Sequence, residues 1–162
     1  MAVDLGAVDL GAADLRAADL RAVDLRAVYL GFDPGSAKCG LAVLRSSGEI
    51  LAHEVVRSDR AIEQLRQWQQ QYQATAIIMG DQTTSKAWVS RLEQGWPDAP
   101  PIQRVDERYS TLAARDRYWE LYPPRGWRKL LPRGLRQPPR PVDDIAAIVL
   151  VERFLANSSP KN

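Results

Sequence analysis

The sequence of 162 residues contains only one cysteine, Cys39, and only one histidine, His53. A single cysteine excludes an internal disulfide framework, so we expect a reducing, cytoplasmic location. One Cys and one His also argue against a zinc site, and His53 is predicted to be exposed on a strand. No apolar run reaches the ~18–20 residues of a membrane-spanning helix, and no signal-peptide pattern stands at the start. These absences favour one soluble domain.

The charge of the chain is nearly balanced overall but uneven along the sequence. Lys and Arg number 22 and Asp and Glu number 20, which gives a formal net charge of +2. Residues 1–30 carry five Asp and three Arg, whereas residues 123–141 carry six basic residues, six prolines and no acid. The positive charge is therefore a local property, and only the segment 123–141 can be called basic.

Residues 1–30 repeat every five positions, with a leucine at each fifth residue from Leu5 to Leu30. This period matches neither an amphipathic helix nor an alternating strand. The stretch resembles pentapeptide repeats, which build a square β-helix, but a solenoid generally needs at least ~3 stacked repeats. We therefore expect residues 1–26 to be a low-complexity extension, disordered or loosely helical, with a partner-binding module as the alternative.

The remainder of the chain, residues 27–157, has the pattern of one α/β domain, followed by an expected disordered tail at 158–162. Short apolar runs predict strands, and helical periodicity predicts helices that Ser58 and Ser110 cap at two N-termini. The expected strands are 28–33, 40–44, 49–56, 74–79 and 102–105, and the expected helices are 59–72, 85–94, 110–121 and 142–156. This order predicts a mixed five-stranded sheet that starts with an antiparallel meander and is flanked by helices.

Acidic residues stand at the ends of several predicted buried elements. Asp33 ends the first strand, Glu107 follows the fifth strand, and Asp143 with Asp144 opens the last helix. A buried carboxylate is costly without a positive partner, and a cluster of carboxylates suits a hard divalent ion such as Mg²⁺ or Mn²⁺. Taken singly, the acids also fit structural roles, because Asp33 could form a turn and Asp143 could cap a helix.

Three motifs follow one another through this domain: YLGFDPGSAKCGLAV at Tyr29–Val43, VDERYSTLAAR at Val105–Arg115 and VDDIAAIVL at Val142–Leu150. In order and spacing they closely resemble the motifs of the YqgF (RuvX) family of nucleases. The resemblance implies an RNase H-like fold for residues 27–157. The loop Gly80–Thr84 departs from the G-L-P sequence usual in the family, which leaves the substrate preference open.

The resemblance implies that Asp33, Glu107 and Asp143 are the catalytic residues and the ligands of the metal. The family motif D-x-x-A-A favours Asp143 over Asp144 as the third acid, because two alanines then follow at +3 and +4. The implied cofactor is Mg²⁺ or Mn²⁺, in a two-metal site. Two ions ~3.5–4 Å apart can activate a water and stabilise the leaving oxygen of a phosphodiester.

Basic residues that could contact nucleic acid lie in two places. Lys38 belongs to the first motif and Arg108 directly follows Glu107, where each either contacts the scissile phosphate or neutralises the acids. The segment 123–141 places basic residues around a tryptophan, which suits phosphate contacts and base stacking. Its predicted contact residues are Arg125, Trp127, Arg128, Lys129, Arg133 and Arg136. The alternative is a solvated, proline-stiffened loop whose three leucines pack back onto the domain.

Within the resembled family, the implied role is 5′-end processing of pre-16S ribosomal RNA during ribosome biogenesis. One alternative is a resolvase of four-way (Holliday) DNA junctions, implied by kinship with the RuvC nucleases. Another is a non-catalytic, RNA-binding ribosome assembly factor that uses the basic segment. A resolvase would need a symmetric dimer. The sequence itself is compatible with a monomer or a weak homodimer, and it leaves open RNA against DNA and Mg²⁺ against Mn²⁺.

Overall fold

The computed structural model describes residues 26–82 and 84–158 of the chain. The expected extension 1–26, except Arg26, and residues 159–162 of the expected tail lie outside the described residues. The strands of the described part are β1 Val28–Asp33, β2 Lys38–Arg45, β3 Ile50–Arg57, β4 Ala76–Gly80 and β5 Ile102–Val105. Its α-helices are α2 Ala61–Tyr72, α3 Thr84–Gly95, α4 Ser110–Leu121 and α5 Asp143–Ser158.

The strands form one mixed sheet in the order β3-β2-β1-β4-β5. β1, β2 and β3 pair antiparallel as a meander, whereas β4 pairs parallel with both β1 and β5. The predicted five-stranded mixed sheet is therefore confirmed. Observed boundaries lie within two residues of the expected ones, and Ser158, assigned to the tail from the sequence, is the last residue of α5. The predicted caps are wrong, because Arg60 and Tyr109 precede α2 and α4 and neither forms a side-chain cap bond.

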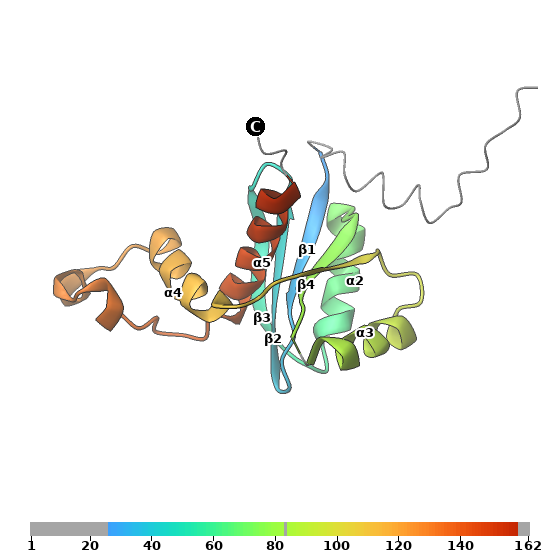
Figure 1. Cartoon of the computed structure of the whole chain (residues 1–162), viewed down its shortest axis with the longest axis horizontal. Coiled ribbons are helices and arrows are strands. Elements are labelled where there is room, and N and C mark those ends of the chain that lie inside the picture. Colours follow the sequence, from blue (N-terminus) through green and yellow to red (C-terminus); the bar gives the residue numbers. More distant parts are fainter. Residues whose placement is uncertain (1–25, 83, 159–162) are drawn as a thin grey trace, which may run out of the picture.

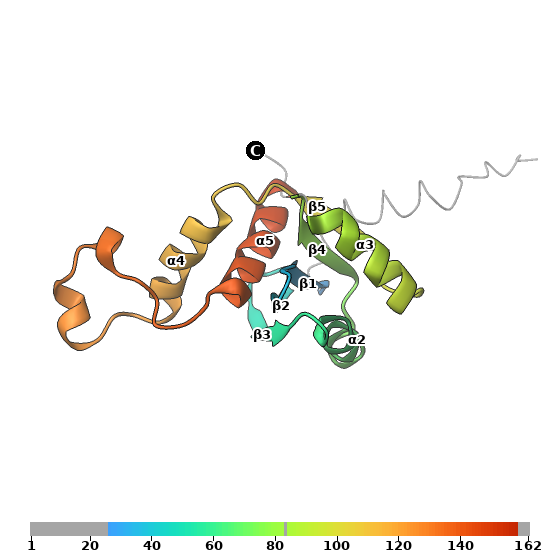
Figure 2. The same cartoon turned by 90° about the horizontal axis from the view of Figure 1, so that it is seen from below.

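Helices cover both faces of the sheet, with α4 and α5 on one face and α2 and α3 on the other (Figures 1 and 2). The alternation of β1 side chains supplies both layers, since successive residues of a strand point to opposite faces. Tyr29 packs with the α4 and α5 layer, and its ring lies 5.2 Å from that of Phe154. Phe32 packs with the α2 and α3 layer, 5.1 Å from the ring of Trp88. Each layer thus has its own apolar core.

The helix α5 lies unusually close to the sheet because two strand residues have no side chain. A Cβ at Gly31 of β1 would meet the backbone oxygen of Ala147, and a Cβ at Gly40 of β2 would overlap the backbone of Asp143. Any larger residue at either position would push the helix outward. The glycines of the sheet, together with the small Ala147, therefore set the height of the first turns of α5 above β1 and β2.

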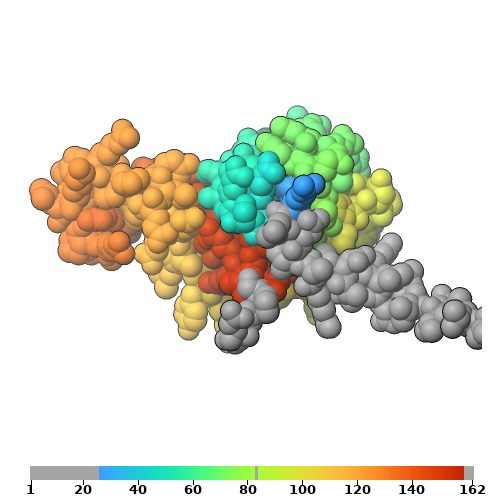
Figure 3. Space-filling model, turned by 90° about the horizontal axis from the view of Figure 1, so that it is seen from above, coloured from blue at the N-terminus to red at the C-terminus, as the bar shows by residue number. Residues whose placement is uncertain are grey.

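The basic segment 123–141, which we call the arm, projects beyond α4 and away from the sheet (Figures 1 and 3). It contains two short 3₁₀ helices, Gly126–Leu130 and Arg133–Leu135. Leu130 and Leu135 are 86% and 67% exposed, so the alternative in which the arm leucines pack onto the domain is wrong for these two. The arm is braced internally instead, because the Arg136 guanidinium donates hydrogen bonds to the backbone oxygens of Leu131 and Lys129.

The most apolar helix of the fold, α5, has 16 residues. In the described residues, neither this helix nor any other is long and apolar enough to cross a membrane.

Candidate functional site

Asp33 lies at the end of β1 between two glycines on the neighbouring strands. On one side it pairs with Gly40 of β2, over which the backbone of Asp143 is packed. On the other side, β1 runs parallel to β4 in the register Phe32 to Met79, and Gly80 comes next. The carboxylate of Glu107 occupies the space that a Cβ at Gly80 would fill.

The two glycines therefore allow acids from two other elements to approach Asp33. Parallel strands bring their carboxyl ends to the same edge of a sheet, which places Glu107, two residues after β5, beside the end of β4. The N-terminus of α5 reaches the same edge because Gly40 lets the helix lie directly on β2. The three acids predicted as one site are thus gathered around the end of β1. The catalytic and metal-binding roles of these residues remain predictions.

Burial raises the pKa of two acids of this site, Asp33 and Glu107. Burial, followed by the charges of Asp143 and Glu107, raises the pKa of Asp33 to about 7. Burial also raises the pKa of Glu107, which is 8% exposed, while a hydrogen bond from the backbone of Gln82 acts in the opposite direction. Among the described residues, none of the three acids forms an ion pair. We call Asp33, Glu107 and Asp143 the acid cluster.

The acid cluster has the chemistry of a site for a hard divalent cation, since it offers carboxylate oxygens without compensating charge. In the described part of the chain, however, no three His, Cys, Asp or Glu side chains are close enough together to hold an ion. Glu107 is held against Gly80 and by the backbone of Gln82. The donors therefore fit Mg²⁺ or Mn²⁺, but at least one side chain has to move before all three could bind the same ion.

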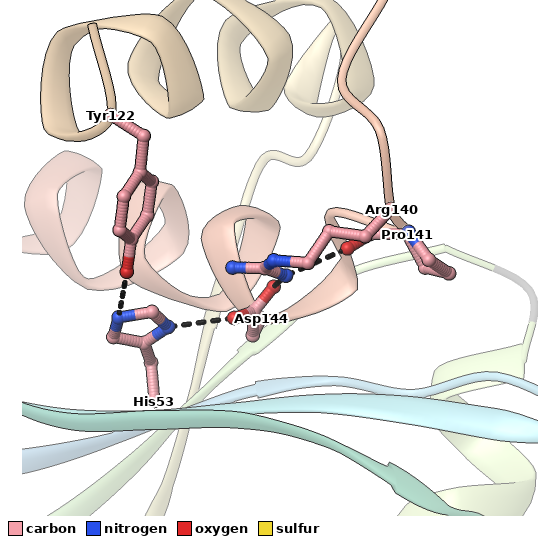
Figure 4. Close-up of polar contacts among 5 residues, drawn as sticks. All are labelled: His53, Tyr122, Arg140, Pro141 and Asp144. Carbon is pink, nitrogen blue, oxygen red and sulfur yellow. Dashed lines mark hydrogen bonds and ion pairs between the residues drawn. The ribbon is translucent and has the colours of Figure 1, made fainter.

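Asp144, next to Asp143, lies in a different environment (Figure 4). Its side chain is 3% exposed, and its two oxygens lie 2.6 Å from Nδ1 of His53 and 2.9 Å from Nη1 of Arg140. Burial alone would raise the pKa of Asp144, but the hydrogen bonds from His53 and Arg140 lower it overall. Asp144 is therefore neutralised by its neighbours, whereas Asp143 lies near Asp33. The choice of Asp143 as the third acid stays a prediction.

His53 is not the exposed strand residue that the sequence predicted. Its side chain is 21% exposed on β3, and its Nε2 lies 3.1 Å from the hydroxyl of Tyr122 while Nδ1 contacts Asp144. Tyr122 directly precedes the arm, and Arg140 is the penultimate residue of the arm. The His53–Asp144 pair thus holds both ends of the arm (Figure 4). Sequence reasoning missed this network because its members are up to 91 positions apart.

The predicted nucleic-acid contacts fall into two groups in space. Lys38 is exposed at the start of β2, and Arg108 is exposed beside Glu107 but bonded to Asp106 by its side chain. The other six lie in the arm, with Trp127 68% exposed. Arg136 is the exception among them, because its guanidinium is used to brace the arm. The contacts themselves remain predictions.

The antiparallel meander, the parallel β4 and β5 and the α5 helix lying across the sheet define an RNase H-like fold of the RuvC type. The structure is similar to Thermus thermophilus RuvC in complex with a Holliday junction substrate, with a TM-score of 0.54 and 18% identity over 82% of this chain and 93% of that one. A second structure of RuvC from that organism gives a TM-score of 0.51 and 19% identity, over 80% and 95% of the two chains.

Residues 27–157 match the sequence profile of the RuvX family, described as Holliday junction resolvase. The chain belongs to the RuvX family, which confirms the resemblance seen in its three motifs. Among curated proteins, none matches the chain at a significant level. Family membership and fold together support a nuclease or Holliday junction resolvase-like function.

Proposed function

We propose that this protein is a metal-dependent nuclease that hydrolyses phosphodiester bonds at the acid cluster. The observation that carries the proposal is the placement of Asp33 between Gly40 and Gly80, which brings two further acids near its carboxylate. In the part of the chain that the structure describes, none of these three acids forms an ion pair with a basic side chain. Such an arrangement stores unfavourable charge that only a proton or a bound cation relieves. Structural acids of this chain, such as Asp144, are paired instead.

Each part of the protein has a separate task in this proposal. Asp33, Glu107 and Asp143 would hold Mg²⁺ or Mn²⁺, and the bound ion would supply the activation of a water and the stabilisation of the leaving oxygen. Lys38 and Arg108, at the same end of the sheet, neutralise the phosphate that enters. The arm binds the nucleic acid outside the cleavage site through Trp127 and through Arg125, Arg128, Lys129 and Arg133.

For the substrate, we propose the 5′ region of pre-16S ribosomal RNA, which is the role implied by the YqgF motifs of the chain. A four-way DNA junction is the second candidate. It is favoured by the description of the RuvX family and by the likeness to RuvC in complex with a Holliday junction substrate. A non-catalytic RNA-binding factor is the third candidate, favoured by the absence of three metal-ligating side chains at binding distance within the described residues.

One side-by-side assay separates these candidates. The full chain is incubated with pre-16S 5′ fragments, unstructured RNA and four-way DNA junctions, in Mg²⁺, in Mn²⁺ and in EDTA. The proposal expects cleavage of the pre-rRNA fragment with metal and loss of cleavage, but not of binding, in Asp33→Asn. Cleavage of the junction alone supports the resolvase, and binding without any cleavage supports the assembly factor.

The matched control is Asp98→Asn. Asp98 is exposed and precedes β5, at the opposite end of that strand from Glu107. If Asp33→Asn cleaves as fast as Asp98→Asn, the acid cluster is not the catalytic site. The contribution of the arm is read from the same binding data, since replacing Arg125, Lys129 and Arg133 by Gln is expected to lower the salt slope of binding by about one per lost phosphate contact.

A further inference from the structure

A hollow of about 310 Å³ lies between the end of α4 and the base of the arm. It is separate from the acid cluster, and its walls come from two segments that fold against each other. The residues that shape it are Trp119, Tyr122, Pro123, Arg125, Arg128 and Pro139. The volume lies at the lower end of the range for ligand-binding pockets, which suits a small planar group and its attachments.

One wall of the hollow is aromatic and rigidly held. The rings of Trp119 and Tyr122 lie 5.0 and 5.1 Å from the buried ring of Tyr118. The indole nitrogen of Trp119 donates to the backbone oxygen of Arg136, and the hydroxyl of Tyr122 contacts His53. Tyr122 nevertheless remains 42% exposed. The hollow thus offers an exposed ring whose position is fixed in advance.

The other wall is positively charged and lacks acids. No Asp or Glu occurs between Glu120 and Asp143 in the sequence. Among the described residues, neither Arg125 nor Arg128 forms an ion pair, whereas Arg140 is taken up by Asp144. The hollow therefore presents two uncompensated guanidinium groups beside an exposed ring.

We propose that this hollow binds one unpaired nucleotide of the nucleic-acid substrate, a step that rests on the proposed function. The base packs on the ring of Tyr122 and the edge of Trp119, and the adjoining phosphate is bound by Arg125 and Arg128. A simple anion would leave the aromatic wall unused, and an apolar partner would bury both guanidinium groups without a counter-charge. A paired base is hidden in its stack, so only an unpaired or flipped-out base can enter.

The hollow would then act as a recognition site for irregular structure, at a distance from the bond that is cut. The His53–Asp144 pair fixes Tyr122 and the C-terminal end of the arm relative to α5. A nucleotide held there would therefore place the rest of the substrate in a defined position relative to Asp143. Selection of the substrate would come from an unpaired position rather than from the sequence of bases.

The test compares a short blunt RNA duplex with the same duplex carrying a single 2-aminopurine bulge. Affinity for the full chain is measured by anisotropy in EDTA, and insertion of the bulged base is followed by 2-aminopurine fluorescence. Stacking on an aromatic side chain is expected to make the bulged duplex bind roughly 5- to 100-fold more tightly and to quench its fluorescence. Equal affinity for the two duplexes, or unquenched fluorescence, would overturn the inference.

The variants separate the ring from the hydrogen bond that holds it. Tyr122→Phe keeps the ring and is expected to retain the preference for the bulge, whereas Tyr122→Leu loses it. Arg125→Gln with Arg128→Gln is expected to weaken binding of the bulged duplex more than of the blunt one, and this pair of surface changes leaves the aromatic wall intact. If Tyr122→Leu and the double variant both keep the full preference, the nucleotide binds elsewhere.

Failure of this inference is distinguishable from failure of the proposed function. If the chain neither binds nor cleaves any of the nucleic acids offered, the proposed function is wrong. If it cleaves with metal and depends on Asp33 but shows no preference for the bulge, the nuclease assignment stands and only the hollow is misassigned.

Discussion

Two neighbouring residues at the start of α5, Asp143 and Asp144, show opposite ways of placing an acid inside a protein. Asp144 has two cationic or proton-donating partners, and its pKa is lowered. Asp143 faces Asp33, whose pKa is raised to about 7 by burial and by like charges. Among the described residues Asp143 forms no ion pair, so the acid cluster is the place where a ligand is expected.

The largest expected effect on stability comes from removing the charge of the paired acid, Asp144. Asp144→Asn leaves His53 and Arg140 without their counter-charge, and removing one partner of a buried pair is strongly destabilising, by about 3–5 kcal/mol. We expect a loss near the lower end, because the Arg140 side chain is 38% exposed. Urea unfolding at pH 7 measures the loss.

The same comparison predicts the pH range of that loss. A carboxyl with a lowered pKa stabilises the fold above its ordinary pKa, here 3.8, and this stabilisation disappears as the pH falls through the folded value. The gap between the parent and Asp144→Asn should therefore close below pH 4. A gap that stays constant down to pH 3 would contradict an ion-paired Asp144.

The second effect, that of removing the charge of Asp33, is a gain of stability instead of a loss. A carboxyl whose pKa is raised stabilises the fold below its unfolded pKa of 3.8 and loses that contribution as the pH rises through about 7. Asp33→Asn removes the charge, so at pH 8 it should be more stable than the parent by about 2–4 kcal/mol, and nearly equal to it at pH 4. Thermal unfolding at both pH values measures this difference, with Asp98→Asn as the control that shows none.

The third effect concerns the cation that the acid cluster is proposed to hold. Mg²⁺ or Mn²⁺ at about 100 times its dissociation constant should stabilise the parent at pH 8 by about 2–3 kcal/mol, and EDTA should reverse the change. Asp33→Asn should show little of this response. Thermal unfolding of the parent and of Asp33→Asn, each with the metal and with EDTA, measures this response. Equal stabilisation of the two proteins by the metal would place the cation elsewhere.

The smallest expected effect on stability comes from displacing the start of α5, which carries both Asp143 and Asp144. Gly40→Ala puts a methyl group into the backbone at Asp143, and such overpacking costs about 1–3 kcal/mol. Cleavage should fall by more than the stability loss explains, because the start of α5 is displaced from β1. Gly134→Ala is the matched control, since no atom lies within 4 Å of the added Cβ. Equal activity of the two variants would show that the height of α5 is not critical.

The strands and helices were predictable because their signals are local. β1 and β5 have the limits that the apolar runs indicated, and the order of the elements is enough for the mixed sheet. The acids of the cluster were chosen for a different reason, and their roles stay predictions. Asp33 and Glu107 stand at strand ends within family motifs, and motifs preserve the spacing of residues that meet in the fold.

The parts that sequence reasoning missed depend on contacts between distant segments. His53 looked exposed because alternation within a strand does not show that Tyr122 and Asp144 would cover it. Ser110 looked like a cap, yet Tyr109 precedes α4 with φ of 59°, so the chain enters the helix from a left-handed residue instead. Neither the direction of the arm nor the hollow at its base has any period or motif that a sequence could reveal.

Both ends of the arm are anchored at the His53–Asp144 pair, and this has a consequence for how the protein can evolve. A segment whose two ends are fixed at one point can grow, shrink or be exchanged without disturbing the sheet that carries the acid cluster. Relatives could therefore acquire new substrates by replacing the arm alone. A chimaera that grafts a foreign arm between Tyr122 and Arg140 would be the engineering counterpart of that natural route.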